Sequence, residues 1–225
     1  MPTAAFDLLG TFFSTEPLRQ RLCALGAPDH ALELWWAESL RDALALTGAG
    51  ATRPLEDVLA ATLPRILAEL GRPAQDPSRV ELVLKGLRVL NPADGAADAA
   101  ARLSASGWTL IGLTRGSEAH ARALTERAGL RKQFAALIAA DHLGTRHADP
   151  YALARQHAGG ETWLVTTHAW DAIAARRAGL RTAWISRRER HWPATYPEPD
   201  LQVPDLAACV QVLERRGATL GAMHA

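Results

Sequence analysis

The sequence predicts an α/β fold: a parallel sheet with helices on both faces and an inserted all-helical cap. Two observations lead to this fold class. After Pro92, helical segments alternate four times with short, continuous apolar runs, which is typical of buried parallel strands joined by crossover helices. Before Pro92, the pattern is helical from Glu16 to about Leu90, and one short strand precedes it. We therefore interpret the helical block as an insertion after the first strand.

The first expected strand covers residues 3–8 and ends in Asp7 and Leu8. Apolar residues then recur at spacings of three and four, which predicts three or four helices in the block. The later elements are expected at 93–104 (helix), 108–113 (strand), 117–128 (helix), 136–140 (strand), 150–157 (helix), 162–166 (strand), 170–178 (helix) and 181–186 (strand). This pattern predicts a sheet of five or six strands, with a core domain of residues 1–14 and 91–225 and a cap domain of residues 15–90.

Composition excludes several classes of protein. The chain has 225 residues, with 25 Lys and Arg against 24 Asp and Glu, so it carries no bulk charge that would attract nucleic acid or an anionic membrane. Its first residues show neither a basic nor a long apolar stretch, so we expect no signal peptide, and no apolar run reaches about 18 residues. We therefore expect a cytoplasmic protein whose partner is a small molecule. The two cysteines, Cys23 and Cys209, are far apart and are expected to be buried thiols rather than metal ligands.

Polar side chains follow the predicted strands at the points where the strands end. The carboxyl ends of parallel strands meet at one edge of a sheet, where ligands bind. An active site is therefore expected there. The candidate catalytic residues are Asp7, Thr11, Thr114, Arg146, His147, Thr166, His168 and Asp171.

Each candidate also has a purely structural interpretation. Asp7 is a possible nucleophile, but it could equally cap a turn. Thr114 and Asp171 each lie close to the start of a predicted helix and could cap it. His168 could carry a proton, contact substrate or be a hydrogen-bonded loop histidine. The charged run at residues 187–191 is expected to be a solvated loop.

Taken together, these segments resemble the haloacid dehalogenase (HAD) superfamily, and most of all its type II 2-haloacid dehalogenase branch. The segment Asp7-Leu8-Leu9-Gly10-Thr11 matches the opening Asp-x-x-Gly-Thr motif. Thr114-Arg115-Gly116 is similar to the second motif, Ser/Thr-Asn-Gly. The segment at 166–171, Thr-Thr-His-Ala-Trp-Asp, resembles Ser-Ser-Asn-Ala-Trp-Asp, and residues 174–187 and 197–206 are also branch-like. The resemblance covers nearly the whole chain and implies a Rossmann-like core.

The resemblance implies a two-step mechanism without a metal or other cofactor. Asp7 would attack the substrate carbon, displace halide with inversion and form an ester, which water then hydrolyses at the carboxylate carbon. Thr11 and Thr114 would orient Asp7. Residues 166, 168 and 171 would surround the ester and the hydrolytic water. The resemblance also implies a homodimer formed through cap helices, and we expect the Trp35-Trp36 pair to add exposed apolar surface there.

The sequence departs from the family pattern at several positions. Leu9 replaces the second Asp of Mg²⁺-dependent phosphatases and also the Tyr that is usual in the dehalogenases. The motif-three Lys is missing, and Arg146, His147 or Arg115 is expected to supply the positive charge near Asp7. The cap Arg that would hold the substrate carboxylate falls near Trp36, with Arg41 the nearest arginine. The expected substrate-binding residues are Leu8, Leu9, Trp36, Arg41, Arg115 and Trp170.

Three functions remain open on the sequence alone. The first is a hydrolase that uses Asp7 on a small, possibly halogenated, carboxylic acid. The second is a catalytically silent or repurposed binding protein, which the missing Lys favours. The third is a Mg²⁺ phosphatase, which Leu9 disfavours.

Overall fold

A computed structural model describes residues 1–72, 77–139 and 149–222. Its centre is one parallel sheet with the strand order β3-β2-β1-β4-β5-β6. This confirms the predicted α/β fold class. The strands are β1 (Thr3–Asp7), β2 (Thr109–Leu113), β3 (Phe134–Ile138), β4 (Thr162–Thr166), β5 (Arg181–Ile185) and β6 (Leu201–Val203).

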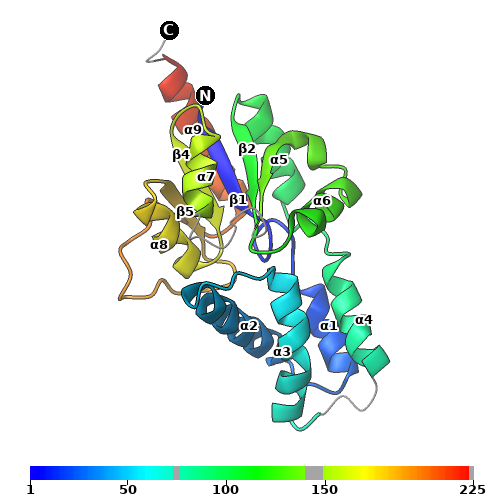
Figure 1. Ribbon diagram of the computed structural model, residues 1–225. Coiled ribbons are helices and arrows are strands. Elements are labelled where there is room, and N and C mark those ends of the chain that lie inside the picture. Colours follow the sequence, from blue (N-terminus) through cyan, green and yellow to red (C-terminus); the bar gives the residue numbers. More distant parts are fainter. Residues whose placement is uncertain (73–76, 140–148, 223–225) are drawn as a thin grey trace.

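Helices cover both faces of the sheet (Figure 1). Alternate residues of β1 point to opposite faces, so Ala4 and Phe6 join one apolar cluster and Ala5 joins the other. The first cluster includes side chains of α5, α6 and α9, and the second includes side chains of α7 and α8. These helices are α5 (Ala96–Ala105), α6 (Glu118–Arg127), α7 (Pro150–Gln156), α8 (Ala169–Arg177) and α9 (Leu206–Ala222); a 3₁₀ turn, η1 (Arg131–Gln133), precedes β3.

Four helices lie between β1 and α5 in the sequence: α1 (Pro17–Ala24), α2 (Ala31–Gly48), α3 (Leu55–Glu69) and α4 (Pro77–Leu87). They lie beyond the carboxyl ends of the strands (Figure 1). No strand falls among the described residues of this segment. The division of the chain into a core domain and a cap domain stays a prediction.

Several details differ from the sequence-based expectations. Strand β6 and helix α9 are not among the expected elements, and β3 begins two residues earlier than expected. Cys23 is exposed, because it lies on the outward side of α1, whereas Cys209 is buried as expected. Trp35 and Trp36 are buried within the chain, so they do not add the expected exposed apolar surface. None of the described helices is long and apolar enough to cross a membrane.

Candidate active site

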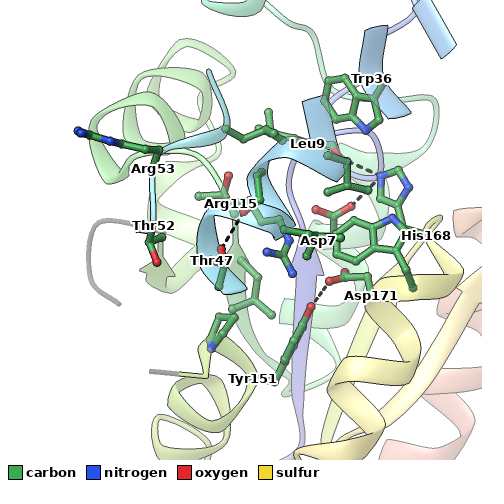
Figure 2. A pocket seen from close by; sticks show the side chains of 18 of the residues that line it. Asp7, Leu9, Trp36, Thr47, Thr52, Arg53, Arg115, Tyr151, His168 and Asp171 are labelled. Atoms are coloured by element: carbon green, nitrogen blue, oxygen red, sulfur yellow. Dashed lines mark hydrogen bonds and ion pairs between the residues drawn. The ribbon is translucent and has the colours of Figure 1, made fainter. Parts of the chain in front are cut away.

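A cavity of about 180 Å³ lies where β1 and β2 end and face α2 (Figure 2). The helical segment and the sheet both contribute to its wall, so neither part forms it alone. Its polar lining comprises Asp7, Thr47, Thr52, Arg53, Thr114, Arg115, Tyr151, His168 and Asp171. Its apolar lining comprises Leu9, Trp36, Leu40, Ala43, Leu44, Leu55, Leu113, Pro150 and Trp170, and Gly50 also borders it.

Asp7 is the last residue of β1, and a tight loop holds its side chain at the cavity. Thr11 donates a hydrogen bond from its hydroxyl to Oδ2 of Asp7 at 2.6 Å. The same Thr11 oxygen accepts a hydrogen bond from the backbone N–H of Thr167 at 2.9 Å, which links the loop to the end of β4. Gly10 has a φ of +95°, a conformation that favours glycine. A Cβ at Gly10 would lie 2.8 Å from Nε2 of His168, so the close approach of the ring also requires glycine.

Burial raises the pKa of Asp7 from 3.8 to about 7. The nearby charge of His168, the hydrogen bond from Thr11 and the charge of Arg115 act in the opposite direction, while the charge of Asp171 adds to the rise. The only ion pair that the described residues give Asp7 is with His168, whose Nε2 lies 3.6 Å from Oδ2. A carboxyl group whose pKa is strongly shifted by burial and nearby charges is common at functional sites.

His168 lies in the turn between β4 and α8. Its backbone N–H donates to the hydroxyl of Thr166 at 3.0 Å, which fixes the turn. Its ring is nearly parallel to that of Trp170, with centroids 5.5 Å apart. Nδ1 lies 3.6 Å from Oε1 of Glu189. Burial opposes the charged form of the ring, but Glu189 and Asp7 outweigh burial and raise the pKa of His168.

Asp171 and Tyr151 form a buried pair that also lines the cavity. The Tyr151 hydroxyl donates a hydrogen bond to Oδ1 of Asp171. Burial and the charge of Asp171 raise the pKa of Tyr151 well above its usual value, so the hydroxyl stays protonated and keeps donating. Figure 2 shows the carboxyl groups of Asp7 and Asp171 on the same side of the cavity, with the Arg115 side chain beside them.

Arg115 supplies a guanidinium to the cavity. Its Cζ lies 4.7 Å from the centre of the Trp170 ring, a cation–π arrangement. Its Nε is buried and has no hydrogen-bond partner among the residues that the structure describes. A buried donor without a partner is costly, so the group is well placed to bind an incoming anion.

Comparison with known proteins identifies the family. The chain is 30% identical over 226 residues to an (S)-2-haloacid dehalogenase of Pseudomonas sp. (strain YL), a match that spans 93% of each chain. This chain belongs to the haloacid dehalogenase superfamily, in its type II 2-haloacid dehalogenase-like branch. The expectation of a hydrolase that acts on carbon–halide bonds is confirmed at the level of this family. No family model matches the sequence.

Solved structures of haloacid dehalogenases share the fold. One L-2-haloacid dehalogenase superposes with a TM-score of 0.86 at 21% identity, covering 95% of this chain and 99% of the other. A second structure is the L-2-haloacid dehalogenase of Xanthobacter autotrophicus with chloropropionic acid covalently bound. It superposes with a TM-score of 0.79 at 21% identity, covering 94% of this chain and 97% of the other.

The structure brings most residues selected by the dehalogenase resemblance to one place. Asp7, Leu9, Trp36, Thr114, Arg115, His168, Trp170 and Asp171 line the cavity. Thr11 and Thr166 lie behind this wall, where Thr11 bonds Asp7 and Thr166 bonds the backbone of His168. The Thr114 hydroxyl accepts from the N–H of Gly116 at 2.9 Å and has no hydrogen bond to Asp7.

Two expected substrate-binding residues lie elsewhere. Leu8 is 1% exposed and packs in the core, because its side chain points to the face of the sheet and not to the cavity. Arg41 faces solvent and pairs with Glu38 and Asp42, at 2.5 and 2.7 Å. Both expectations are therefore corrected. Arg146 and His147, proposed replacements for the dehalogenase lysine, lie outside the described residues.

The charged run at 187–191 contains the residues that sequence reasoning missed. It is expected to be solvated, and Arg187 is indeed exposed, but its first three residues make contacts at the site, and Arg188 and Glu189 are partly buried. Arg187 donates to the carbonyl of Thr11 at 3.0 Å, and the Arg188 guanidinium lies over the Trp36 ring at 5.1 Å. Glu189 reaches His168. A charged run directly after a strand end is the available signal, because that edge of a parallel sheet carries the site. Tyr151 is also absent from the predicted site residues.

Proposed function

We propose that this protein is a 2-haloacid dehalogenase that uses the carboxylate of Asp7 as a covalent nucleophile. The observation that carries the proposal is the position of that carboxylate. It lies at the carboxyl end of the central strand, facing a small, largely apolar cavity that also contains a guanidinium. Thr11 and His168 orient the group. The covalently bound chloropropionic acid in the Xanthobacter autotrophicus structure supports this interpretation.

The proposed reaction has two steps. An Asp7 oxygen forms a bond to C2 of the haloacid while the carbon–halogen bond breaks, and halide leaves with the bonding electron pair. The resulting ester is then attacked by water at Cγ of Asp7. The products are a 2-hydroxy acid, halide, a proton and the regenerated carboxylate. Asp171 is the proposed acceptor of the water proton, because Tyr151 occupies only one of its two carboxylate oxygens.

The cavity favours a small anionic substrate. Its volume of about 180 Å³ suits an acid of a few carbon atoms. Arg115 is the proposed partner of the substrate carboxylate, since its buried Nε is free to donate. The apolar side chains of Leu9, Trp36 and Leu40 would contact the alkyl group and the halogen.

We propose that the reaction needs no metal. The phosphatase relatives bind Mg²⁺, which prefers several oxygen ligands in octahedral geometry. Here Leu9 places an alkyl group on the cavity wall near Asp7, and Nε2 of His168 lies close to the Asp7 carboxylate. The described residues contain no group of three His, Cys, Asp or Glu that could hold a metal ion. These neighbours of Asp7 support a reaction without Mg²⁺.

Halide release tests the proposal directly. We expect chloride or bromide release from (S)-2-halopropionate, unaffected by a chelator and abolished in Asp7→Asn. In a single turnover with excess enzyme in H₂¹⁸O, the label should enter Asp7 and not the product, because water attacks the ester at the side-chain carbon. Label in the product, with Asp7 unlabelled, would exclude the covalent route. Chelator-sensitive phosphate release would instead support a phosphatase.

A repurposed binding protein is the second candidate, because the motif-three Lys is missing from the sequence. This candidate would be supported if added halopropionate or lactate raised the melting temperature of the protein while no halide was released.

A homodimer is proposed from the family resemblance. Leu44 and Leu82, in α2 and α4, are 43% and 54% exposed and are candidates for a subunit contact. Light scattering at micromolar concentration tests this, and a monomer mass would refute it.

A further inference from the structure

Both ring nitrogens of His168 face a carboxylate. Nε2 lies 3.6 Å from Oδ2 of Asp7, and Nδ1 lies 3.6 Å from Oε1 of Glu189. Nε2 also lies 3.4 Å from the carbonyl oxygen of Leu9. All three of these neighbouring oxygens are hydrogen-bond acceptors when the carboxyl groups are ionised. The His168 side chain is only 4% exposed, so water cannot replace these partners freely.

A neutral imidazole does not suit this arrangement. It has one N–H and one lone pair, so one of its nitrogens would direct a lone pair at a carboxylate oxygen. An imidazolium has two N–H groups and can donate in both directions. The remaining charges around the ring are Arg188, which disfavours a cation, and Asp171, which favours one. Two carboxylates face the ring nitrogens directly and Asp171 adds to their effect, whereas Arg188 opposes it.

Glu189 is itself held in place. Its Oε2 accepts a hydrogen bond from the backbone N–H of Ala169 at 2.7 Å, in the first turn of α8. The nearby His168 ring and the hydrogen bond from Ala169 overcome the effect of burial and lower the pKa of Glu189, so the group is ionised at neutral pH. The ring stacks on Trp170, and the absence of a side chain at Gly10 leaves room for it.

We propose that Glu189 is a positioning residue that keeps His168 as an imidazolium, and that this cation is, within the described part of the chain, the positive charge facing the nucleophilic carboxylate of Asp7. The charge state of His168 does not depend on the proposed function. The catalytic half of the inference, the effect of this charge on Asp7 as a nucleophile, rests on it. The cation would favour the ionised form of Asp7 and offset the repulsion between that carboxylate and an anionic substrate. Arg115 and Arg188 do not replace it, because neither lies within ion-pair distance of Asp7.

The test separates the charge of Glu189 from its structural hydrogen bond. Glu189→Gln removes the negative charge, but its amide oxygen can still accept from Ala169. Glu214→Gln is the matched control, since Glu214 pairs with Arg102 at 2.6 Å and its side chain is 27% exposed, against 33% for Glu189. His168 is observed in ¹⁵N-histidine-labelled protein by NMR, with its signals assigned by their loss in His168→Gln. Melting temperatures establish that each variant is folded.

The expected result is a doubly protonated His168 at pH 7 in the wild type. In Glu189→Gln its titration midpoint should fall by about one pH unit or more, and in Glu214→Gln it should stay unchanged. The alkaline limb of kcat/KM for halide release should move with the midpoint. A neutral ring at pH 7 in the wild type, or a midpoint that does not respond to Glu189→Gln, would overturn the proposal.

Measuring halide release beside the NMR titration shows which claim fails, the dehalogenase function or the charge on His168. If the wild type releases no halide, the proposed function fails, while the NMR titration still decides the state of His168. If the titration moves but the alkaline limb does not, the catalytic half of the inference is refuted and the dehalogenase proposal stands.

Discussion

Ser117 donates its backbone N–H to Oε1 of Glu56 at 2.9 Å, joining the first turn of α3 to the residue before α6. His120 adds a second contact, with Nδ1 3.8 Å from Oε2 of Glu56. Next to them, the N–H of Leu55 donates to the carbonyl of Arg115 at 2.9 Å. These contacts join the helical segment to the sheet beside the cavity. Glu56 and Ser117 lie 61 residues apart in the sequence.

Glu56→Ala should therefore destabilise the protein by about 1–3 kcal/mol at pH 7. Burial opposes ionisation of Glu56, but the nearby His120 ring and the hydrogen bonds from Ser117 lower its pKa to about 2. Because the folded-state pKa lies below the unfolded one, this stabilisation is complete above about pH 5 and declines as the pH falls toward 2. Urea denaturation across this range measures it. Glu69→Gln, on the exposed side of α3, is the control and should have little effect.

Asp7→Asn should make the protein more stable at pH 8, by about 2 kcal/mol. Burial raises the pKa of Asp7 above its unfolded value, so the folded state holds the proton more tightly and loses stability as the pH rises from about 4 to 7. The neutral amide avoids this loss. The gain should shrink toward pH 4, as measured by chemical denaturation. A variant less stable than the wild type at pH 8 would contradict the electrostatic argument.

The rate of halide release should rise with pH through about 7. Only the ionised carboxylate is a nucleophile, and burial places the pKa of Asp7 in this range. The acid limb of the pH profile of kcat/KM reports the pKa of Asp7 in the free enzyme. A limb near pH 4 would mean that Asp7 is as acidic as an exposed aspartate.

Thr11→Val should move that acid limb to higher pH and lower kcat by about tenfold or more. The variant loses the hydrogen bond that favours the carboxylate, and the N–H of Thr167 loses its acceptor. Thr11→Ser keeps the hydroxyl and should stay close to the wild type. If both variants move the limb equally, packing of the methyl group matters more than the hydrogen bond.

Arg115→Gln should raise KM for halopropionate by about tenfold to a hundredfold, with a smaller effect on kcat. The reason is loss of the cation expected to bind the substrate carboxylate. Arg53→Gln is the control, because Arg53 borders the same cavity but its side chain points away from the centre (Figure 2). A kcat effect without a KM effect would assign Arg115 a role in the chemical step.

Local patterns are enough to predict the sheet and most of its strands. Apolar runs such as 162–166 are buried on both faces, so their character is visible in the sequence. Strand β6 has three residues, one of them exposed, and such a short edge strand leaves little pattern. Leu8 is expected at the site because its neighbours in the motif lie there, whereas the pleat of the chain directs it into the core.

The sequence by itself determined the fold class, the helical segment between the first two strands and the position of Asp7 at a strand end. These features depend on periodicity and on the order of elements along the chain. Only the tertiary structure decided which charges meet. Glu189 lies 21 residues beyond His168 and 182 beyond Asp7, yet its carboxylate faces the same ring. Parallel strands bring their carboxyl ends to one edge, and the loops that follow fold back over it. Two residues of a charged run that looks solvated in the sequence, Arg188 and Glu189, thus become part of the site.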